Sequence, residues 1–182
     1  QILMGFPSFH HIFHQAPQGM NAKDLSMNFL TISMVICRIL EKKTLGLKPD
    51  GKLITLDIND ELETMVRGFF EESGLASQID YRLGNARKII PTLEGLFDLV
   101  FIDADKFYYS EYFDLVIDKV RTGGIILADN VLWSGKILVE EGKKIDKDTK
   151  ALIDFNNKVQ NDQRVENVLL PIRDGVLMAR KL

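Results

Sequence analysis

The sequence predicts an α/β fold, a mostly parallel sheet with helices on both faces. From residue 52 onward, short apolar runs alternate with amphipathic segments, which is typical of repeated strand–helix units. The last two apolar runs are separated only by Arg173, Asp174 and Gly175, and so tight a turn predicts an antiparallel hairpin. The chain has 182 residues, of which 46% are hydrophobic, enough for the core of one globular domain.

Each expected element has a local signal. The first helix begins near Asn59 or Asp60, carries acids in its first turn and ends at Gly74. The pair Gly123-Gly124 is expected to turn the chain into the next strand. The last helix has Leu152, Phe155 and Val159 on one side. In chain order, we expect strands at 52–58, 79–83, 97–103, 125–129, 165–172 and 176–182, and helices at 59–74, 86–93, 108–120 and 147–162.

Composition excludes several classes of function. The formal charge of −3 is spread without a long run of one sign, and no basic patch is interleaved with aromatics, so nucleic acid is not expected as a partner. No apolar run reaches the roughly 18 residues of a membrane span, and the chain does not start with a signal-peptide pattern. The single Cys37 is interpreted as a core residue. We therefore expect a cytoplasmic protein that binds a small molecule.

Three acidic residues follow directly on predicted parallel strands. Asp57, Asp103 and Asp129 each stand at the carboxyl end of an apolar run, and Lys106 and Asn130 are close to them in the chain. Sheets of this kind bind ligands at the carboxyl edge of their strands. One acid there could equally be a solvated helix cap. Three acids together with an amine and an amide indicate a ligand site.

The first fifty residues are less informative. We expect an N-terminal helical segment at 1–35 and the main domain at 36–182. His10, His11 and His14 could share a helical face, which is a possible zinc spacing. Three histidines without a nearby cysteine or acid are more often a surface or packing feature, so we assign no metal to them.

Several segments in order carry a family resemblance. They are FDLVFIDADKFYYSEYFD and GGIILADNVLWSGKI, supported by GKLITLDIND, LGNARKIIPTL and FNNKVQNDQRVENVLLPIRDGVLMARK. Over residues 50–182 the chain resembles the cation-dependent, S-adenosylmethionine-dependent O-methyltransferases of the catechol and caffeoyl-CoA type, particularly the bacterial members. The resemblance implies the Rossmann-like class I methyltransferase fold, with a seven-stranded sheet whose last strand is antiparallel.

The resemblance also implies a metal site and a base. Asp103, Asp129 and Asn130 match the family's ligands to a divalent cation, and two carboxylates with one amide suit Mg²⁺, with Ca²⁺ or Mn²⁺ as possible alternatives. Lys106 matches the general base that removes a proton from the acceptor hydroxyl. An ordinary solvated lysine remains the alternative interpretation, because a base must have a lowered pKa.

The resemblance assigns further residues to the cofactor and the acceptor. The cofactor residues would be Asp57 for the ribose hydroxyls, Ile58, the adenine-side segment Gly84, Asn85 and Ala86, and Asp103. Trp133 and Tyr112 would border the acceptor, although packing is an open alternative for both. Tyr109 shares the family's tyrosine spacing and is interpreted as a packing residue.

One departure from the family stands out. In the family, a Gly-rich loop that approaches the cofactor follows the first strand. Here RILE (38–41) resembles that strand end, yet KKTLGLKPDG follows at once. Either the loop is absent from the protein or residues are missing from the sequence at this point. We favour the second, because a deletion would leave no room for a crossover helix.

The expected function is methyl transfer from S-adenosylmethionine to a hydroxyl of a catechol-like or caffeoyl-type aromatic diol, assisted by the cation, in a homodimer. The alternative is a non-catalytic binding module of the same fold that has lost the cofactor loop. A nicotinamide-dependent oxidoreductase would share Asp57, but the Gly-x-Gly-x-x-Gly turn is absent. The natural acceptor, its regiochemistry and the metal used in the cell do not follow from the sequence.

Overall fold

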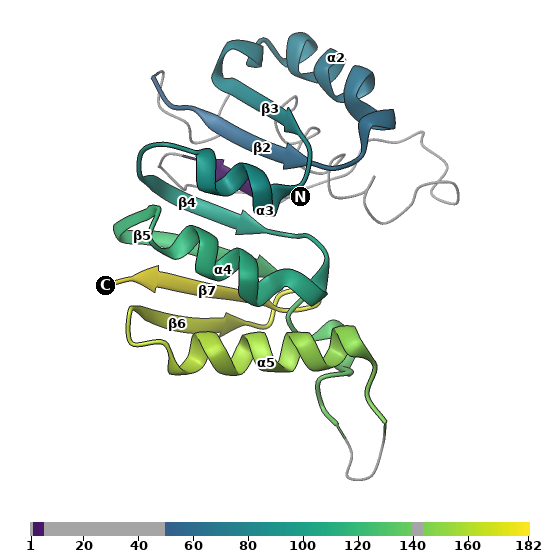
Figure 1. Ribbon diagram of the computed structural model, residues 1–182, viewed down its shortest axis with the longest axis vertical. Helices are drawn as coiled ribbons and strands as arrows, with labels where there is room; N and C mark the ends of the chain where they lie inside the picture. Colours follow the sequence, from purple (N-terminus) through teal and green to yellow (C-terminus); the bar gives the residue numbers. More distant parts are fainter. Residues whose placement is uncertain (1, 6–49, 140–143) are drawn as a thin grey trace.

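The computed structural model describes residues 2–5, 50–139 and 144–182. Its strands form one sheet in the order β3-β2-β1-β4-β5-β7-β6 (Figure 1). The strands are β1 (Ile2–Gly5), β2 (Leu53–Asp57), β3 (Ile79–Leu83), β4 (Phe97–Ile102), β5 (Val120–Asp129), β6 (Val165–Leu170) and β7 (Val176–Lys181).

Strand directions agree with the predicted α/β class. β2 pairs in parallel with β3, and β4 pairs in parallel with β5. β7 runs antiparallel to both β5 and β6, which confirms the predicted C-terminal hairpin and the antiparallel last strand.

The centre of the sheet differs from the expectation. β1 lies between β2 and β4 and runs antiparallel to both. The strand that we expected to end at residues 38–41 lies outside the described residues, as do the site of the Gly-rich loop, Cys37 and the three histidines. The helical segment expected at 1–35 also lies outside them, except for the four residues of β1.

Four α-helices and five short 3₁₀ turns connect the described strands. The α-helices are α2 (Glu63–Ser73), α3 (Ala86–Ile89), α4 (Tyr109–Ile117) and α5 (Lys147–Asn161), and the 3₁₀ turns are η1 (Asp60–Leu62), η2 (Ala76–Gln78), η3 (Ile90–Thr92), η4 (Lys106–Tyr108) and η5 (Trp133–Gly135). The predicted start and stop signals are confirmed: Asn59 caps η1, and Gly74 ends α2 in the left-handed conformation at φ 70°.

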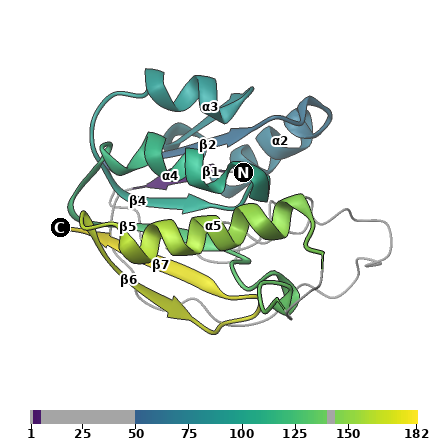
Figure 2. The same cartoon turned by 60° about the horizontal axis from the view of Figure 1, so that its bottom comes forward.

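The helices form a layer on each face of the sheet. α3, α4 and α5 lie side by side on one face (Figures 1 and 2). α2 packs against β3 through a separate apolar cluster of Val66, Phe70 and Tyr81. Since β2 to β3 and β4 to β5 progress toward opposite edges of the sheet, right-handed crossovers put α2 on the other face.

Several boundaries differ from the prediction. The helix expected at 86–93 ends at Ile89 and continues as η3, and the strand expected at 165–172 ends at Leu170. The helix expected at 108–120 ends at Ile117, and β5 begins at Val120, so Gly123-Gly124 lies within the strand instead of in a turn. The ladder shifts register at this point, between Phe97 and Leu99 of β4. A Cβ on Gly124 would lie 2.6 Å from Val120 Cγ1 and 3.1 Å from Phe97 O, so the glycine permits a close approach at an irregularity of the strand.

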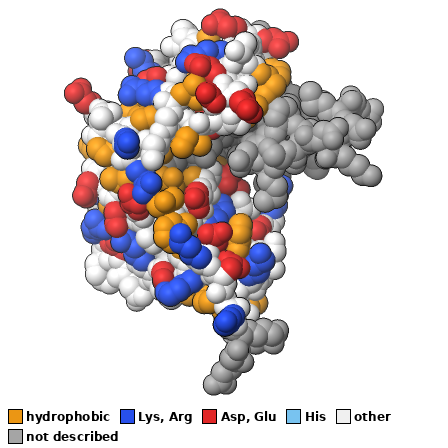
Figure 3. Space-filling view, turned by 45° about the vertical axis from the view of Figure 1, so that its right-hand side comes forward, with side chains coloured by type: hydrophobic (Ala, Val, Ile, Leu, Met, Phe, Trp, Pro, Cys, Tyr) orange, Lys and Arg blue, Asp and Glu red, His pale blue; other side chains and the backbone are white. Residues whose placement is uncertain are grey.

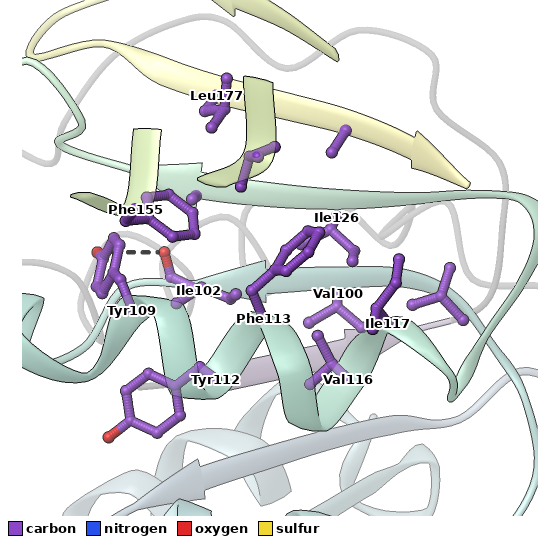
Figure 4. Packing of buried hydrophobic residues seen from close by; sticks show 14 of the residues in the cluster. Val100, Ile102, Tyr109, Tyr112, Phe113, Val116, Ile117, Ile126, Phe155 and Leu177 are labelled. Atoms are coloured by element: carbon purple, nitrogen blue, oxygen red, sulfur yellow. Dashed lines mark hydrogen bonds between the residues drawn. The ribbon is translucent and has the colours of Figure 1, made fainter. Parts of the chain in front are cut away.

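The main core lies between the sheet and the layer of α4 and α5. Phe113, Val116 and Ile117 of α4 pack over Val100 and Ile126 of the central strands (Figure 4). The predicted apolar side of α5 is confirmed, because Leu152, Phe155 and Val159 are all fully buried. This packing fixes the strands whose ends carry the polar residues of interest.

The surface carries mixed charge. Figure 3 shows acidic and basic side chains interspersed over the face that it presents, with apolar side chains between them. In the ranges that the structure describes, no helix is long and apolar enough to cross a membrane.

Candidate active site

The ends of β4 and β5 bring the predicted metal ligands close together. The two strands pair in parallel with Ile102 opposite Ala128, so Asp103 and Asp129 follow at neighbouring positions on the sheet edge. Asn130 comes next and adopts the left-handed conformation at φ 59°. Asparagine tolerates this conformation better than most residues. The chain therefore changes direction directly after β5, at Asn130.

Lys106 lies in the middle of this group. Asp105 caps the turn η4 by accepting a hydrogen bond from Phe107 N, and Lys106 is the first residue of that turn. The residue is 8% exposed. Three oxygen atoms lie within hydrogen-bond reach of its Nζ: Asp103 Oδ1 at 3.3 Å, Asn130 Oδ1 at 3.4 Å and the carbonyl oxygen of Asp129 at 3.4 Å. Lys106 is thus a cation enclosed by oxygen atoms.

Tyr109 is the partner that the sequence reasoning missed. Lys106 Nζ also donates to the Tyr109 hydroxyl in a short hydrogen bond, and it lies 4.4 Å from the centre of the tyrosine ring. The hydroxyl in turn donates to Asp129 O at 3.0 Å and lies 3.4 Å from Ile102 O (Figure 4). The i, i+3 spacing of Lys106 and Tyr109 at the start of a helix was the available signal.

Burial and charge shift the pKa values of this cluster. Burial lowers the pKa of Lys106 below its ordinary value, although the Asp103 carboxylate acts in the opposite direction. Burial also raises the pKa of Asp129, against the effect of the hydrogen bond that Asn130 N donates to its carboxylate at 2.7 Å. The amine is therefore easier to deprotonate than a solvated lysine.

The turn between β6 and β7 holds the segment after Asn130 in place. Val131 N donates to Gly175 O at 3.1 Å, and Leu132 N donates to Asp174 O at 3.0 Å. Gly175 has a φ of 79°, and a Cβ there would lie 2.5 Å from Leu132 Cγ. Only glycine fits this close approach without displacing the segment.

The donor set suits a hard divalent cation. Asp103 Oδ1 and Asn130 Oδ1 both point at one cationic centre, the Lys106 ammonium, and Asp129 adds a second nearby carboxylate. Oxygen ligands of this kind are those that Mg²⁺ or Ca²⁺ prefers. In the described part of the chain, no three residues of the types His, Cys, Asp and Glu are grouped so that they could hold a metal. The predicted ligands are two acids and one amide, so they are not a group of this kind.

The predicted cofactor residues other than Asp103 form a second group at the ends of β2 and β3. Gly84 N donates to Asp57 O at 2.7 Å, and the Asp57 carboxylate accepts from Asn59 N at 3.0 Å. Asn85 caps α3 by accepting from Arg87 N, so its side-chain oxygen has a structural role, and Ala86 is the first residue of that helix. Ile58 is 75% exposed. β1 separates this group from the Lys106 group along the sheet.

Arg87 connects the two groups, a contact that the sequence did not indicate. Its guanidinium lies 3.8 Å from the centre of the Tyr108 ring and donates to Glu111 at 3.2 Å. α3, which begins beside Asn85, is therefore tied to η4 and α4, which carry Lys106 and Tyr109.

The two predicted acceptor residues occupy different environments. Tyr112 is 7% exposed, and its ring meets Tyr108 and points away from Tyr109 and Phe155 (Figure 4). Trp133 is half-buried, and its buried Nε1 has no hydrogen-bond partner among the described residues. Lys136 Nζ lies 5.2 Å from the centre of the Trp133 ring, and Lys136 also lines a pocket of about 210 Å³ at the start of α5.

Comparison with known proteins shows which protein family the chain belongs to. An O-methyltransferase family model matches residues 27–182. The chain is 35% identical over 156 residues to tricin synthase 2 of Oryza sativa subsp. japonica, which covers 80% of the chain and 53% of that protein. It is 34% identical over 147 residues to caffeoyl-CoA O-methyltransferase 1 of Eucalyptus globulus, which covers 76% of the chain and 60% of that protein. The chain thus spans between half and two thirds of the length of these curated relatives.

A solved structure agrees with this assignment. The SAH-bound methyltransferase PaMTH1 of Podospora anserina superposes with a TM-score of 0.64 at 30% identity. The match covers 71% of this chain and 60% of that one.

Proposed function

Because the chain belongs to the O-methyltransferase family, we propose that it transfers the methyl group of S-adenosylmethionine to one hydroxyl of a catechol-like or caffeoyl-type aromatic acceptor. The reaction would be assisted by a divalent cation, with Mg²⁺ preferred over Ca²⁺ or Mn²⁺. The observation that carries this proposal is the convergence of Asp103, Asn130 and Lys106 on one point at the carboxyl edge of the sheet.

In this mechanism Asp103, Asp129 and Asn130 would hold the cation. When bound, the cation would supply Lewis-acid chemistry that lowers the pKa of an acceptor hydroxyl. Lys106 accepts the hydroxyl proton at Nζ. Its burial supports this role, because burial favours the neutral amine that a base must be. The acceptor oxygen then takes the methyl group from the sulfur of S-adenosylmethionine, and S-adenosylhomocysteine is released.

The ends of β2 and β3 supply the proposed cofactor half. The Asp57 carboxylate accepts hydrogen bonds from the ribose hydroxyls, and Gly84, Asn85 and Ala86 border the adenine. The exposed Ile58 supports this assignment, since an apolar side chain that is 75% exposed beside Asp57 is available to cover a flat base. Asp103 would contact the cofactor from the neighbouring half.

The acceptor would lie against Trp133, next to the cation ligands. Among the described residues, the buried Nε1 of Trp133 has no hydrogen-bond partner. This supports the position, because an acceptor atom of the ligand would satisfy the donor and so stabilise the complex. Tyr112 would also border the acceptor, beside Tyr108, whose ring it contacts. Two relatives are named tricin synthase and caffeoyl-CoA O-methyltransferase. We propose an aromatic acceptor for this chain as well.

The test is to incubate the full chain with S-adenosylmethionine, Mg²⁺ and a catechol or caffeoyl acceptor and to detect the methylated product by mass spectrometry. We expect one added methyl group per acceptor and an equal amount of S-adenosylhomocysteine. Calorimetric titration with S-adenosylmethionine separates the alternative: cofactor binding without transfer points to an untested acceptor, whereas no binding favours the non-catalytic module.

We further propose that the chain works as a cytoplasmic homodimer with residues 36–182 as its catalytic domain. The apolar character of the N-terminal segment in the sequence motivates the dimer. Light scattering at micromolar concentration should give twice the monomer mass of 20.7 kDa. A monomer mass would contradict the proposal.

A further inference from the structure

The Lys106 ammonium has the surroundings of a bound cation. It is 8% exposed, and three oxygen atoms from Asp103, Asp129 and Asn130 lie 3.3 to 3.4 Å from Nζ. Two of these atoms, Asp103 Oδ1 and Asn130 Oδ1, belong to the side chains to which the proposed function assigns the divalent ion. The amine and the ion therefore draw on the same oxygen atoms.

We infer that the Lys106 ammonium and the divalent cation are alternative occupants of one oxygen cluster, so that an entering ion displaces the amine from Asp103 and Asn130. This inference rests on the proposed function for the identity of the ion. Divalent cations bind oxygen at about 2.0 to 2.6 Å, so an ion shared by Asp103 Oδ1 and Asn130 Oδ1 competes with Nζ for the space between them.

Displacement of the amine gives the cluster two states. With the amine in place, the ammonium compensates the buried charges of Asp103 and Asp129, which would otherwise destabilise the fold. With the ion in place, the ion compensates them, and the long lysine side chain can move without unfolding its turn. The same side chain thus stabilises the edge of the sheet before the ion binds.

The test compares Mn²⁺ binding by the wild-type protein, Lys106→Met and Lys106→Arg, measured as free Mn²⁺ by electron paramagnetic resonance. We expect Lys106→Met to lower the Kd for Mn²⁺ by about tenfold or more, because a positive charge within about 4 Å of an ion opposes its binding even at the dielectric constant of water. Lys106→Arg keeps the charge and should bind no more tightly than the wild type.

Lys147→Met is the matched control. Lys147 is exposed on α5, and its Nζ lies 3.5 Å from the centre of the ring of Phe107, the residue after Lys106. Its removal takes one positive charge from the same region without touching the oxygen cluster. We expect its Kd for Mn²⁺ to stay within about twofold of the wild type, since exposed charges are well screened.

Thermal unfolding gives a second readout. Without metal, Lys106→Met should unfold at a lower temperature than the wild type, and Mn²⁺ should raise its Tm by more than it raises that of the wild type. Should Lys106→Met fail to fold, tighter binding by Lys106→Arg than by the wild type would overturn the inference.

The outcomes separate this inference from the proposed function. Equal Mn²⁺ affinities of the wild type and Lys106→Met would overturn the inference and leave the proposed function intact. If the wild type transferred a methyl group to none of the acceptors while Lys106→Met bound Mn²⁺ more tightly as expected, only the proposed function would be contradicted. If neither the wild type nor Lys106→Met bound Mn²⁺, both the inference and the cation-assisted function would be contradicted.

Discussion

At the scale of single residues, Lys106 and Tyr109 belong to one chain of hydrogen bonds at the end of β5. The amine donates to the tyrosine hydroxyl, and that hydroxyl donates to the backbone oxygen of Asp129. Tyr109 is fully buried, with its ring 5.3 Å from that of Phe155. Before an ion binds, the Lys106 amine is therefore held against a side chain of the core.

Lys106→Met tests the role of the amine in catalysis. We expect kcat to fall by roughly 10²- to 10⁴-fold, as is typical of a lost general acid–base group, while the affinity for S-adenosylmethionine stays close to that of the wild type. Lys106→Arg should not restore the rate, because a guanidinium does not give up its proton near neutral pH. Steady-state kinetics with calorimetry measures both quantities. Near wild-type kcat in Lys106→Met would remove the base assignment.

At the scale of elements, α3 and α4 join the proposed cofactor half to the Lys106 half. The contacts are the guanidinium of Arg87 over the Tyr108 ring and the ion pair of Arg87 with Glu111. The ion pair is partly exposed and contributes little by itself. We expect the stacking contact to contribute more than the ion pair to the connection between the two helices.

Arg87→Met should loosen this connection. We expect the KM for S-adenosylmethionine to rise by about two- to fivefold with a smaller change in kcat, because the stacking free energy positions the start of α3. The matched variant Glu111→Gln keeps the stacking and should leave KM nearly unchanged. Equal effects of the two variants would show that the ion pair, and not the stacking, connects the helices.

The turn between β6 and β7 is the second connecting element. Gly175→Ala puts a methyl group against Leu132 in a left-handed conformation, and we expect it to lower the free energy of unfolding by about 1 to 3 kcal/mol. It should also raise the KM for the acceptor, since Leu132 follows the proposed cation ligands. Gly95→Ala is the control: Gly95 has φ 86° but nothing within 4 Å of an added Cβ.

Denaturant unfolding and kinetics separate the two glycine variants. Gly95→Ala should show only the backbone cost of about 1 kcal/mol and normal kinetics. A KM for the acceptor that is unchanged in Gly175→Ala would contradict the supporting role of this turn.

At the scale of the whole molecule, the sequence predicted the order and type of the described strands and helices from residue 52 onward, because several of them begin or end at a strong local signal. Asn59, Gly74 and the apolar side of α5 are examples. The acids at the ends of β4 and β5 also lie close together, since these strands are neighbours in the sheet, whereas β1 separates Asp57 from them.

What the sequence did not predict depends on contacts between distant segments. The antiparallel β1 in the centre of the sheet has no local signal for its direction. The irregularity at Gly124 depends on Phe97 of another strand, and the contact of Arg87 with Tyr108 joins two helices. Periodicity and capping rules describe one element at a time, so such contacts escape them.

The most direct measurement of the central claim is methyl transfer to a catechol acceptor before and after exhaustive chelation with EDTA, followed by addition of Mg²⁺. Because Asp103, Asp129 and Asn130 present only oxygen ligands, we expect chelation to abolish transfer and Mg²⁺ to restore it. Asp129→Ala should need more Mg²⁺ for half-maximal rate. Transfer that continues unchanged after complete chelation would contradict a cation-assisted methyltransferase.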